Sequence, residues 1–157
     1  MSDDPQRYDL AQYNIARMLA PLDDPRLADF VADLDRINKL GDRSPGFVWR
    51  LQADDGNSTS VRIHDDPMLL VNFTVWESVE ALFDFAYHSE HVEVFRRRRE
   101  WFEEARTPYL VLWWISAGEI PSMAEAERRL AVLAANGPSR EAFTFKQRFE
   151  PPVRASR

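Results

Sequence analysis

The segment Leu69-Leu-Val-Asn-Phe-Thr-Val-Trp76 predicts a β-strand that is apolar on both of its faces. Successive side chains of a strand point to opposite sides of the sheet. A sheet face that is apolar and left open to water would be a sticky patch, so both sides of this strand need a cover. One side carries Leu69, Val71, Phe73 and Val75, and the other carries Leu70, Thr74 and Trp76.

Four more strands are predicted around this segment. Residues 9–18 alternate loosely, and residues 46–52 have a strand-like composition. Residues 109–117 form a continuous apolar run, which suits a strand buried on both faces. The acidic segment 53–67 is a loop too long for a tight hairpin turn, and residues 143–149 are expected to form a last, edge-like strand.

Helices are predicted between the strands from their capping signals and their apolar spacing. A Ser, Thr, Asp or Asn before the first turn caps a helix, and glycine often ends one. We expect helices over residues 25–41 after the N-cap Asp24, over residues 77–105 with a break at Ser89, and over residues 122–137 from the capping box Ser122-x-x-Glu125.

The resulting order is β-α-β-β-α-β followed by α-β. This is the split βαβ arrangement, a ferredoxin-like antiparallel sheet of the α+β class with two helices on one face. The other face would then be bare. Because its residues are apolar, we expect two copies of the chain to dimerise sheet to sheet.

The composition is that of one compact domain. The 157 residues are 45% hydrophobic and 29% charged, without an internal Gly/Ser-rich or Pro-rich linker. We therefore expect a single domain over residues 1–157, with an ordered core over about 9–149. The absence of cysteine excludes disulfides, thiolate metal sites and a cysteine nucleophile.

Charge and hydropathy exclude further classes of protein. The net charge of −6 argues against nucleic acid as a partner, because phosphate binding needs a basic surface. No apolar run approaches the roughly 18 residues of a membrane helix, and the polar first residues do not resemble a secretion signal. The glycine-rich loops of nucleotide-binding proteins and the Gly-x-Ser-x-Gly motif of serine hydrolases are absent. These features predict a cytoplasmic protein.

Several segments together resemble the bacterial domain-of-unknown-function family 3291. The resemblance covers about residues 9–149. That family is similar to the dimeric α+β barrel superfamily, which includes antibiotic-biosynthesis monooxygenases, haem-degrading monooxygenases and relatives of chlorite dismutase. The resemblance implies a homodimer with a ligand cavity between each sheet and its helices. The segments that carry it are Leu10-Ala-Gln-Tyr-Asn-Ile-Ala-Arg17, Pro21-Leu-Asp-Asp-Pro25, Phe30-Val-Ala-Asp-Leu-Asp-Arg-Ile-Asn38, Pro45-Gly-Phe-Val-Trp-Arg-Leu51, Trp76-Glu-Ser-Val-Glu-Ala-Leu82 and Arg97-Arg-Arg-Glu-Trp-Phe102.

Polar side chains within the apolar strands are the best candidates for a site. Asn72, Thr74 and Trp76 share one face, and Gln12 and Asn14 lie on a strand that could be adjacent. The pair Asn72 and Trp76 resembles the pocket of cofactor-independent ring-oxidising monooxygenases, which implies that the amide polarises a substrate oxygen and the indole stacks on the ring. The alternative is a structural amide, paired with its neighbours, beside a core tryptophan.

His88 and His91 flank the expected break at Ser89. An unperturbed histidine titrates near neutrality, which suits general acid or base catalysis. Two histidines alone do not make a metal site, and no third and fourth ligands are evident, so we expect no metal. The alternative is a helix cap and a surface histidine.

The run Arg96-Arg-Arg-Arg99 is explained mainly by pairing on a solvated helix face. Each of the pairs Glu93 with Arg97, Arg96 with Glu100 and Arg99 with Glu103 is four residues apart. We expect one arginine, Arg96, at the mouth of the cavity, where it would bind an anionic group of the substrate. Haem-degrading relatives carry their iron ligand in this part of the chain, which has no histidine here, so no haem or other cofactor is expected.

Tryptophans supply further aromatic surface. Trp49 and Trp113 are predicted to contact the ligand. Because Trp113 and Trp114 are adjacent in a strand, one of them faces the core and the other faces the cavity or the dimer interface.

Taken together, these features predict a monooxygenase-like enzyme that acts on a small hydrophobic or aromatic substrate without a cofactor. The alternative is a non-catalytic homodimer that binds a small ligand or is associated with stress, in which the same polar residues hold the sheet together. An open cavity and a group with a perturbed pKa would favour the enzyme. A cavity filled by Trp76 and Trp113 would favour the second class.

Overall fold

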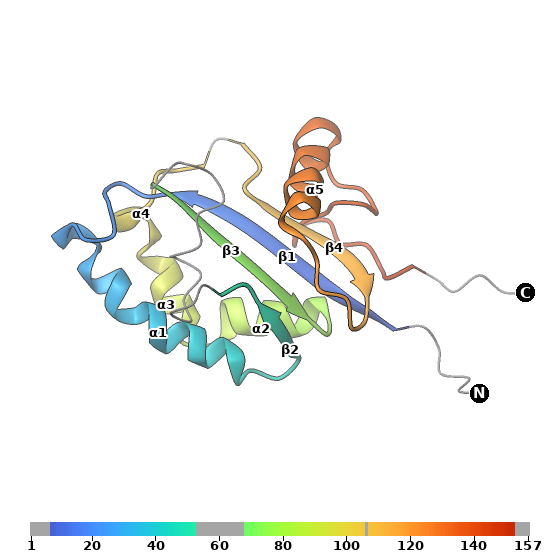
Figure 1. Cartoon of the computed structure of the whole chain (residues 1–157), viewed down its shortest axis with the longest axis horizontal. Coiled ribbons are helices and arrows are strands. Elements are labelled where there is room, and N and C mark those ends of the chain that lie inside the picture. Colours follow the sequence, from blue (N-terminus) through green and yellow to red (C-terminus); the bar gives the residue numbers. More distant parts are fainter. Residues whose placement is uncertain (1–6, 53–67, 106, 153–157) are drawn as a thin grey trace, which may run out of the picture.

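The computed structural model describes residues 7–52, 68–105 and 107–152. Within them, four antiparallel strands form one sheet in the order β2-β3-β1-β4 (Figure 1). This is the order of a split βαβ unit, so the predicted ferredoxin-like α+β fold is confirmed. The predicted loop over 53–67 lies outside the described residues. The strands are β1 (Tyr8–Arg17), β2 (Phe47–Arg50), β3 (Leu69–Trp76) and β4 (Leu110–Ser116).

Most helices begin where the capping signals place them. The hydroxyl of Ser78 accepts a hydrogen bond from the backbone N–H of Ala81, and that of Ser122 accepts one from Glu125, both at 3.1 Å. These bonds satisfy backbone donors that a helix start leaves unpaired. The helical segments are the 3₁₀ turn η1 (Pro25–Leu27), α1 (Ala28–Asp42), α2 (Val79–His88), α3 (His91–Arg96), α4 (Arg98–Trp101) and α5 (Met123–Asn136).

The predicted break in the helix after β3 is confirmed at Ser89. Its hydroxyl donates to the carbonyl of Phe85 and accepts a hydrogen bond from the backbone N–H of His91 at 3.1 Å. The chain breaks a second time at Arg97, and the last helical residue is Trp101 rather than residue 105. Each break changes the direction in which the side chains of the next helical segment point. Residues after a break therefore face a different side than they would in one continuous helix.

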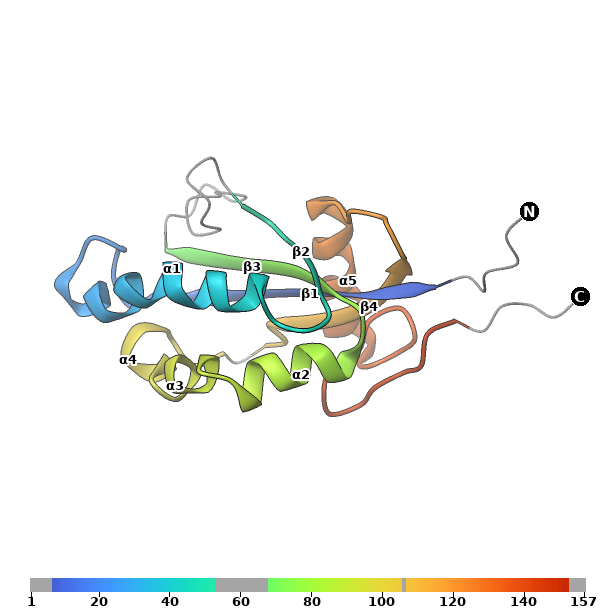
Figure 2. The ribbon, with the colours of Figure 1, turned by 90° about the horizontal axis from the view of Figure 1, so that it is seen from below.

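Helices cover both faces of the sheet (Figure 2). Helices α1 to α4 lie on one face, while α5 lies on the other and packs Ala126 and Leu133 against Trp113. On that second face Phe73 is 1% exposed and Val75 is fully buried. The prediction of a bare apolar face is therefore wrong, because a single chain already buries these residues.

The predicted strand over residues 143–149 is also wrong. Phe143 forms one isolated bridge with Leu112, with N–O distances of 2.8 and 2.9 Å in the two directions. The chain beyond it leaves the edge of β4, because Phe145 packs against Phe83 and Tyr87 on α2, each with ring centroids 5.9 Å apart. Aromatic packing against α2 therefore replaces strand pairing in this segment.

None of the helices in the described parts of the chain is long and apolar enough to cross a membrane.

Candidate functional site

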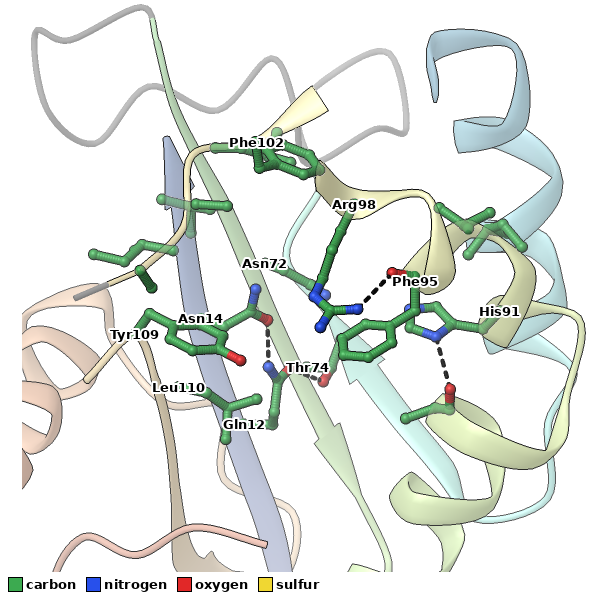
Figure 3. Close-up of a pocket in the computed structure, with 18 of the residues that line it drawn as sticks. Gln12, Asn14, Asn72, Thr74, His91, Phe95, Arg98, Phe102, Tyr109 and Leu110 are labelled. Atoms are coloured by element: carbon green, nitrogen blue, oxygen red, sulfur yellow. Dashed lines mark hydrogen bonds between the residues drawn. The ribbon is translucent and has the colours of Figure 1, made fainter. Parts of the chain in front are cut away.

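A cavity of about 650 Å³ lies between the sheet and helices α1 to α4. Strands β1 and β3 form its floor with Gln12, Asn14, Asn72 and Thr74 (Figure 3). These four residues share a face because each strand contributes alternate positions to it. The rest of the lining is mainly apolar and aromatic, and includes Leu70, Phe85, Phe95, Phe102, Tyr109 and Leu110.

A chain of hydrogen bonds runs along this floor. The indole Nε1–H of Trp76 donates to the hydroxyl oxygen of Thr74 at 3.0 Å. The Thr74 hydroxyl donates to Oε1 of Gln12 at 2.7 Å, and Nε2 of Gln12 donates to Oδ1 of Asn14. Thr74 and Gln12 are opposite each other in the register of β3 and β1, which brings their side chains within reach.

The bonds of this chain run in one direction, from the indole of Trp76 to Asn14. An indole N–H can only donate, so the Thr74 hydroxyl oxygen accepts from it, and in this structure the hydroxyl proton is donated to Oε1 of Gln12. Nε2 of Gln12 faces Asn14 and donates to its carbonyl oxygen. The Nδ2H₂ group of Asn14 is left as a donor in the cavity lining. The strand floor thus offers a ligand an oriented N–H donor at Asn14.

Asn72 has a different environment from Gln12 and Asn14. It is exposed, lies opposite Asn14 in the register of β3 and β1, and lines the same cavity. No hydrogen bond of its side chain is found within the described residues. Its amide is therefore available to a ligand.

His91 lies across the cavity on α3, between the rings of Phe85 and Phe95. Burial lowers the pKa of His91, and the hydrogen bond between its Nδ1 and the carbonyl of Ala86, at 3.0 Å, opposes that shift in part. A carbonyl oxygen can only accept, so Nδ1 carries the proton of the neutral ring. Nε2 then carries the lone pair, which is the form of a general base.

Comparison with known proteins assigns the family. The sequence pattern of the domain of unknown function DUF3291 matches residues 9–157. The chain belongs to the DUF3291 family. No curated protein matches this DUF3291 domain.

Three solved structures are similar to this DUF3291 domain. SnoaB, a cofactor-independent oxygenase from Streptomyces nogalater, is 16% identical with a TM-score of 0.48, over 71% of this chain and 95% of SnoaB. PA3566 from Pseudomonas aeruginosa is 13% identical with a TM-score of 0.47, over 74% of this chain and 100% of PA3566. The third structure is a protein from Nitrosomonas europaea that is named provisionally as an antibiotic biosynthesis monooxygenase. It is 14% identical with a TM-score of 0.38, over 76% of this chain and 96% of that protein.

Trp76 contributes to this site through its N–H rather than through its ring. The side chain is 1% exposed and its ring stacks on Phe85, with centroids 5.2 Å apart, while the edge of Phe47 meets it at 5.4 Å. The expected stacking of a substrate ring on this indole is therefore blocked by Phe85. The cavity offers the rings of Phe95 and Tyr109 instead.

Four residues predicted to belong to the site lie elsewhere in the DUF3291 domain. Trp49 and Trp113 are on the opposite sheet face, where both rings pack on Phe73, because odd-numbered positions of these strands face α5. His88 is exposed and bonds Asp84 at 3.0 Å, while Arg96 is exposed and outside the cavity lining. Trp114 also lies outside the lining, and its indole donates to the Phe149 carbonyl at 2.8 Å.

The three predicted pairs of the arginine run do not form within the described residues. Because the helix breaks at Arg97, this residue bonds Glu100 and Asp29 instead, both at 2.8 Å. Arg98, which the sequence interpretation did not select, lines the cavity in place of Arg96. The sequence does hold a signal for it: Arg98 has Val94 and Phe102 four residues away, where the other arginines each have a glutamate.

The described residues include no group of three or more His, Asp and Glu side chains that could hold a metal ion. The lining contains one histidine, His91, beside the amides and apolar groups described above, and it also includes charged side chains: Arg17, Asp33, Arg50, Arg98, Arg99, Glu103 and Glu104. The N–H donors of the strand floor and the neutral imidazole thus share this cavity with an aromatic surround.

Proposed function

We propose that this protein is a cytoplasmic, cofactor-independent monooxygenase that oxidises a small aromatic or hydrophobic substrate in the cavity between its sheet and helices. The observation that carries the proposal is the chain of hydrogen bonds that leaves Nδ2 of Asn14 as an oriented donor in an aromatic cavity. A donor of this kind polarises a substrate carbonyl and stabilises the enolate that forms when a neighbouring carbon loses a proton.

His91 is the base in this proposal. A neutral imidazole with its lone pair on Nε2 takes a proton from a CH₂ group made acidic by a flanking carbonyl and by aromatic rings. The resulting carbanion transfers an electron to O₂ and then combines with the reduced oxygen as a hydroperoxide. Loss of water leaves a ketone, so R₂CH₂ and O₂ give R₂C=O and H₂O. The substrate supplies all the electrons, which is why no cofactor is needed.

Anthrone, a flat aryl ketone with one acidic CH₂ group, is a suitable test substrate. Purified protein without added reductant should consume one O₂ for each anthraquinone formed. With ¹⁸O₂, one labelled atom should appear in the product and the other in water. Heat-denatured protein measures the spontaneous oxidation of anthrone, which is subtracted.

Asn14→Ala should lose about a hundredfold in rate, the lower end of what loss of one donor to a developing oxyanion costs. Asn136→Ala is the matched control, because Asn136 is exposed at the end of α5 on the other side of the sheet. Equal rates in both variants would contradict the role of Asn14. Anthrone that binds without O₂ consumption would contradict the catalytic proposal and favour the non-catalytic ligand-binding class.

The homodimer implied by the family resemblance stays a prediction. The physical argument from a bare sheet face no longer supports it, because Val71, Phe73 and Val75 are buried within one chain. Sedimentation equilibrium at micromolar concentration tests the dimer. A species of 18.3 kDa whose thermal stability does not change on dilution would contradict it.

A further inference from the structure

Arg98 is a cation without a carboxylate partner in the described part of the chain. Its guanidinium stacks over the ring of Phe95, with 4.2 Å between its central carbon and the ring centroid, and Nη1 donates to the Phe95 carbonyl at 3.1 Å. The neighbouring Arg97 differs, because it bonds both Asp29 and Glu100. The remaining N–H groups of Arg98 are therefore free for a ligand.

The side chain of Arg98 reaches from α4 into the cavity that Asn14 and Asn72 line (Figure 3). The carbonyl oxygen of Asn14 already accepts a hydrogen bond from Gln12, so Nδ2 is the group of this amide left without a partner in the described residues. Two carboxylates of the lining are already engaged, Asp33 by Arg36 at 3.2 Å and Glu103 by Arg17 at 3.8 Å. Arg99 and Glu104, both exposed, also line the cavity, and their charges offset each other.

Stacking on Phe95 holds the guanidinium plane in place, which lowers the entropy lost when a ligand binds to it. A guanidinium presents two parallel N–H groups that match the two oxygens of a carboxylate. An aromatic body attached to that carboxylate would contact the apolar surfaces of Phe102, Tyr109 and Leu110, which line the same cavity. The protein as a whole carries a net charge of −6, so a free cation in the cavity is a local feature rather than part of a basic surface.

We propose that the substrate is an aromatic carboxylate, with its carboxylate bound by Arg98 and its ring system in the apolar part of the cavity. This inference rests on the proposed function, because it names the class of molecule that the same cavity takes. It places the carboxylate at Arg98 and leaves Nδ2 of Asn14 for the carbonyl oxygen of the reacting group.

The test uses two probes of nearly equal shape, 2-naphthoate and 2-naphthamide, titrated into the protein at pH 7 by calorimetry. The wild type should bind the naphthoate at least tenfold more tightly than the neutral amide. Arg98→Gln should weaken naphthoate binding at least tenfold and change naphthamide binding less than twofold. Arg98→Lys keeps the positive charge but loses the planar guanidinium with its two parallel N–H donors. It should therefore retain only part of the preference for naphthoate over naphthamide.

Arg96→Gln is the matched control, because it removes the same charge two residues away from an exposed side chain outside the cavity lining. It should keep the full preference for naphthoate. Thermal unfolding should show at most a small loss of stability in Arg98→Gln, since Arg98 is exposed and its contacts in the described residues are the ring and the carbonyl of Phe95. If Arg98→Gln is too unstable to measure, Arg98→Lys replaces it in the test. A preference for naphthoate in Arg98→Lys that equals that of the wild type would contradict binding of the carboxylate by two parallel N–H groups of the guanidinium.

The outcomes separate this inference from the proposed function. Equal affinity of the wild type for the two probes, or a preference that persists in Arg98→Gln, overturns the inference while leaving the cavity as a ligand site. If neither probe binds the wild type, both the carboxylate inference and the proposal of an aromatic substrate are wrong.

Discussion

The indole nitrogen of Trp76 lies 3.0 Å from the hydroxyl oxygen of Thr74, two residues before it on the same face of β3. This contact joins a residue of the aromatic core to the polar floor of the cavity. The indole can only donate, and from it the bonds run through Thr74 and Gln12 to the carbonyl oxygen of Asn14. A tryptophan whose ring is closed to the ligand is thus linked by hydrogen bonds to the candidate catalytic amide.

Thr74→Val should destabilise the protein by about 1–3 kcal/mol, because it leaves the indole N–H of Trp76 and Oε1 of Gln12 buried without partners. Urea denaturation measures this loss. Thr74→Ser keeps the hydroxyl and should recover most of the stability. A valine variant as stable as the serine variant would show that the hydrogen-bond chain contributes nothing to the fold.

Trp76→Phe should also cost about 1–3 kcal/mol of unfolding free energy, since it removes a donor and leaves a void beside Phe85. Trp49→Phe is the control, because Trp49 is only half-buried on the other face. Combining Trp76→Phe with Thr74→Val should cost less than the sum of the two, as both remove the same bond. Strict additivity in urea denaturation would contradict the contact between them.

Asn72→Ala should change the unfolding free energy by no more than about 0.5 kcal/mol, because Asn72 is exposed and its amide has no partner in the described residues. Its effect should appear in the affinity for 2-naphthoate, measured by calorimetry. A loss of several kcal/mol in stability with unchanged affinity would instead assign Asn72 a structural role.

His91 should make the stability depend on pH. Burial lowers its pKa below the ordinary value of about 6.5, so between the folded pKa and 6.5 the unfolded chain binds more protons than the native chain. This contribution is complete above pH 6.5 and is lost as the pH falls through that window. His91→Gln should therefore lose less stability than the wild type between pH 7.5 and pH 5 in urea denaturation. Equal losses of stability in the two proteins would contradict the lowered pKa of His91.

The part of the site on the strands could be predicted because a strand has a period of two residues. Counting alternate positions is enough to place Asn72, Thr74 and Trp76 on one face, and the register of β1 with β3 adds Gln12 and Asn14. The part of the site on the helices could not be predicted in this way. The breaks at Ser89 and Arg97 change the rotation of the chain, so the spacing of one continuous helix does not show which arginine enters the cavity, although Arg98 is the one without a glutamate four residues away.

The amino-acid sequence by itself determined the four strands of the sheet, the two faces of β3 and the helix starts at Ser78 and Ser122. Each of these depends on residues close together in the chain. Only the tertiary structure decided that α5 covers the second sheet face, since an amphipathic helix can pack equally well on either side of a sheet. The tertiary structure also turned Phe145 away from β4, because its packing against α2 outweighs the local preference for a strand.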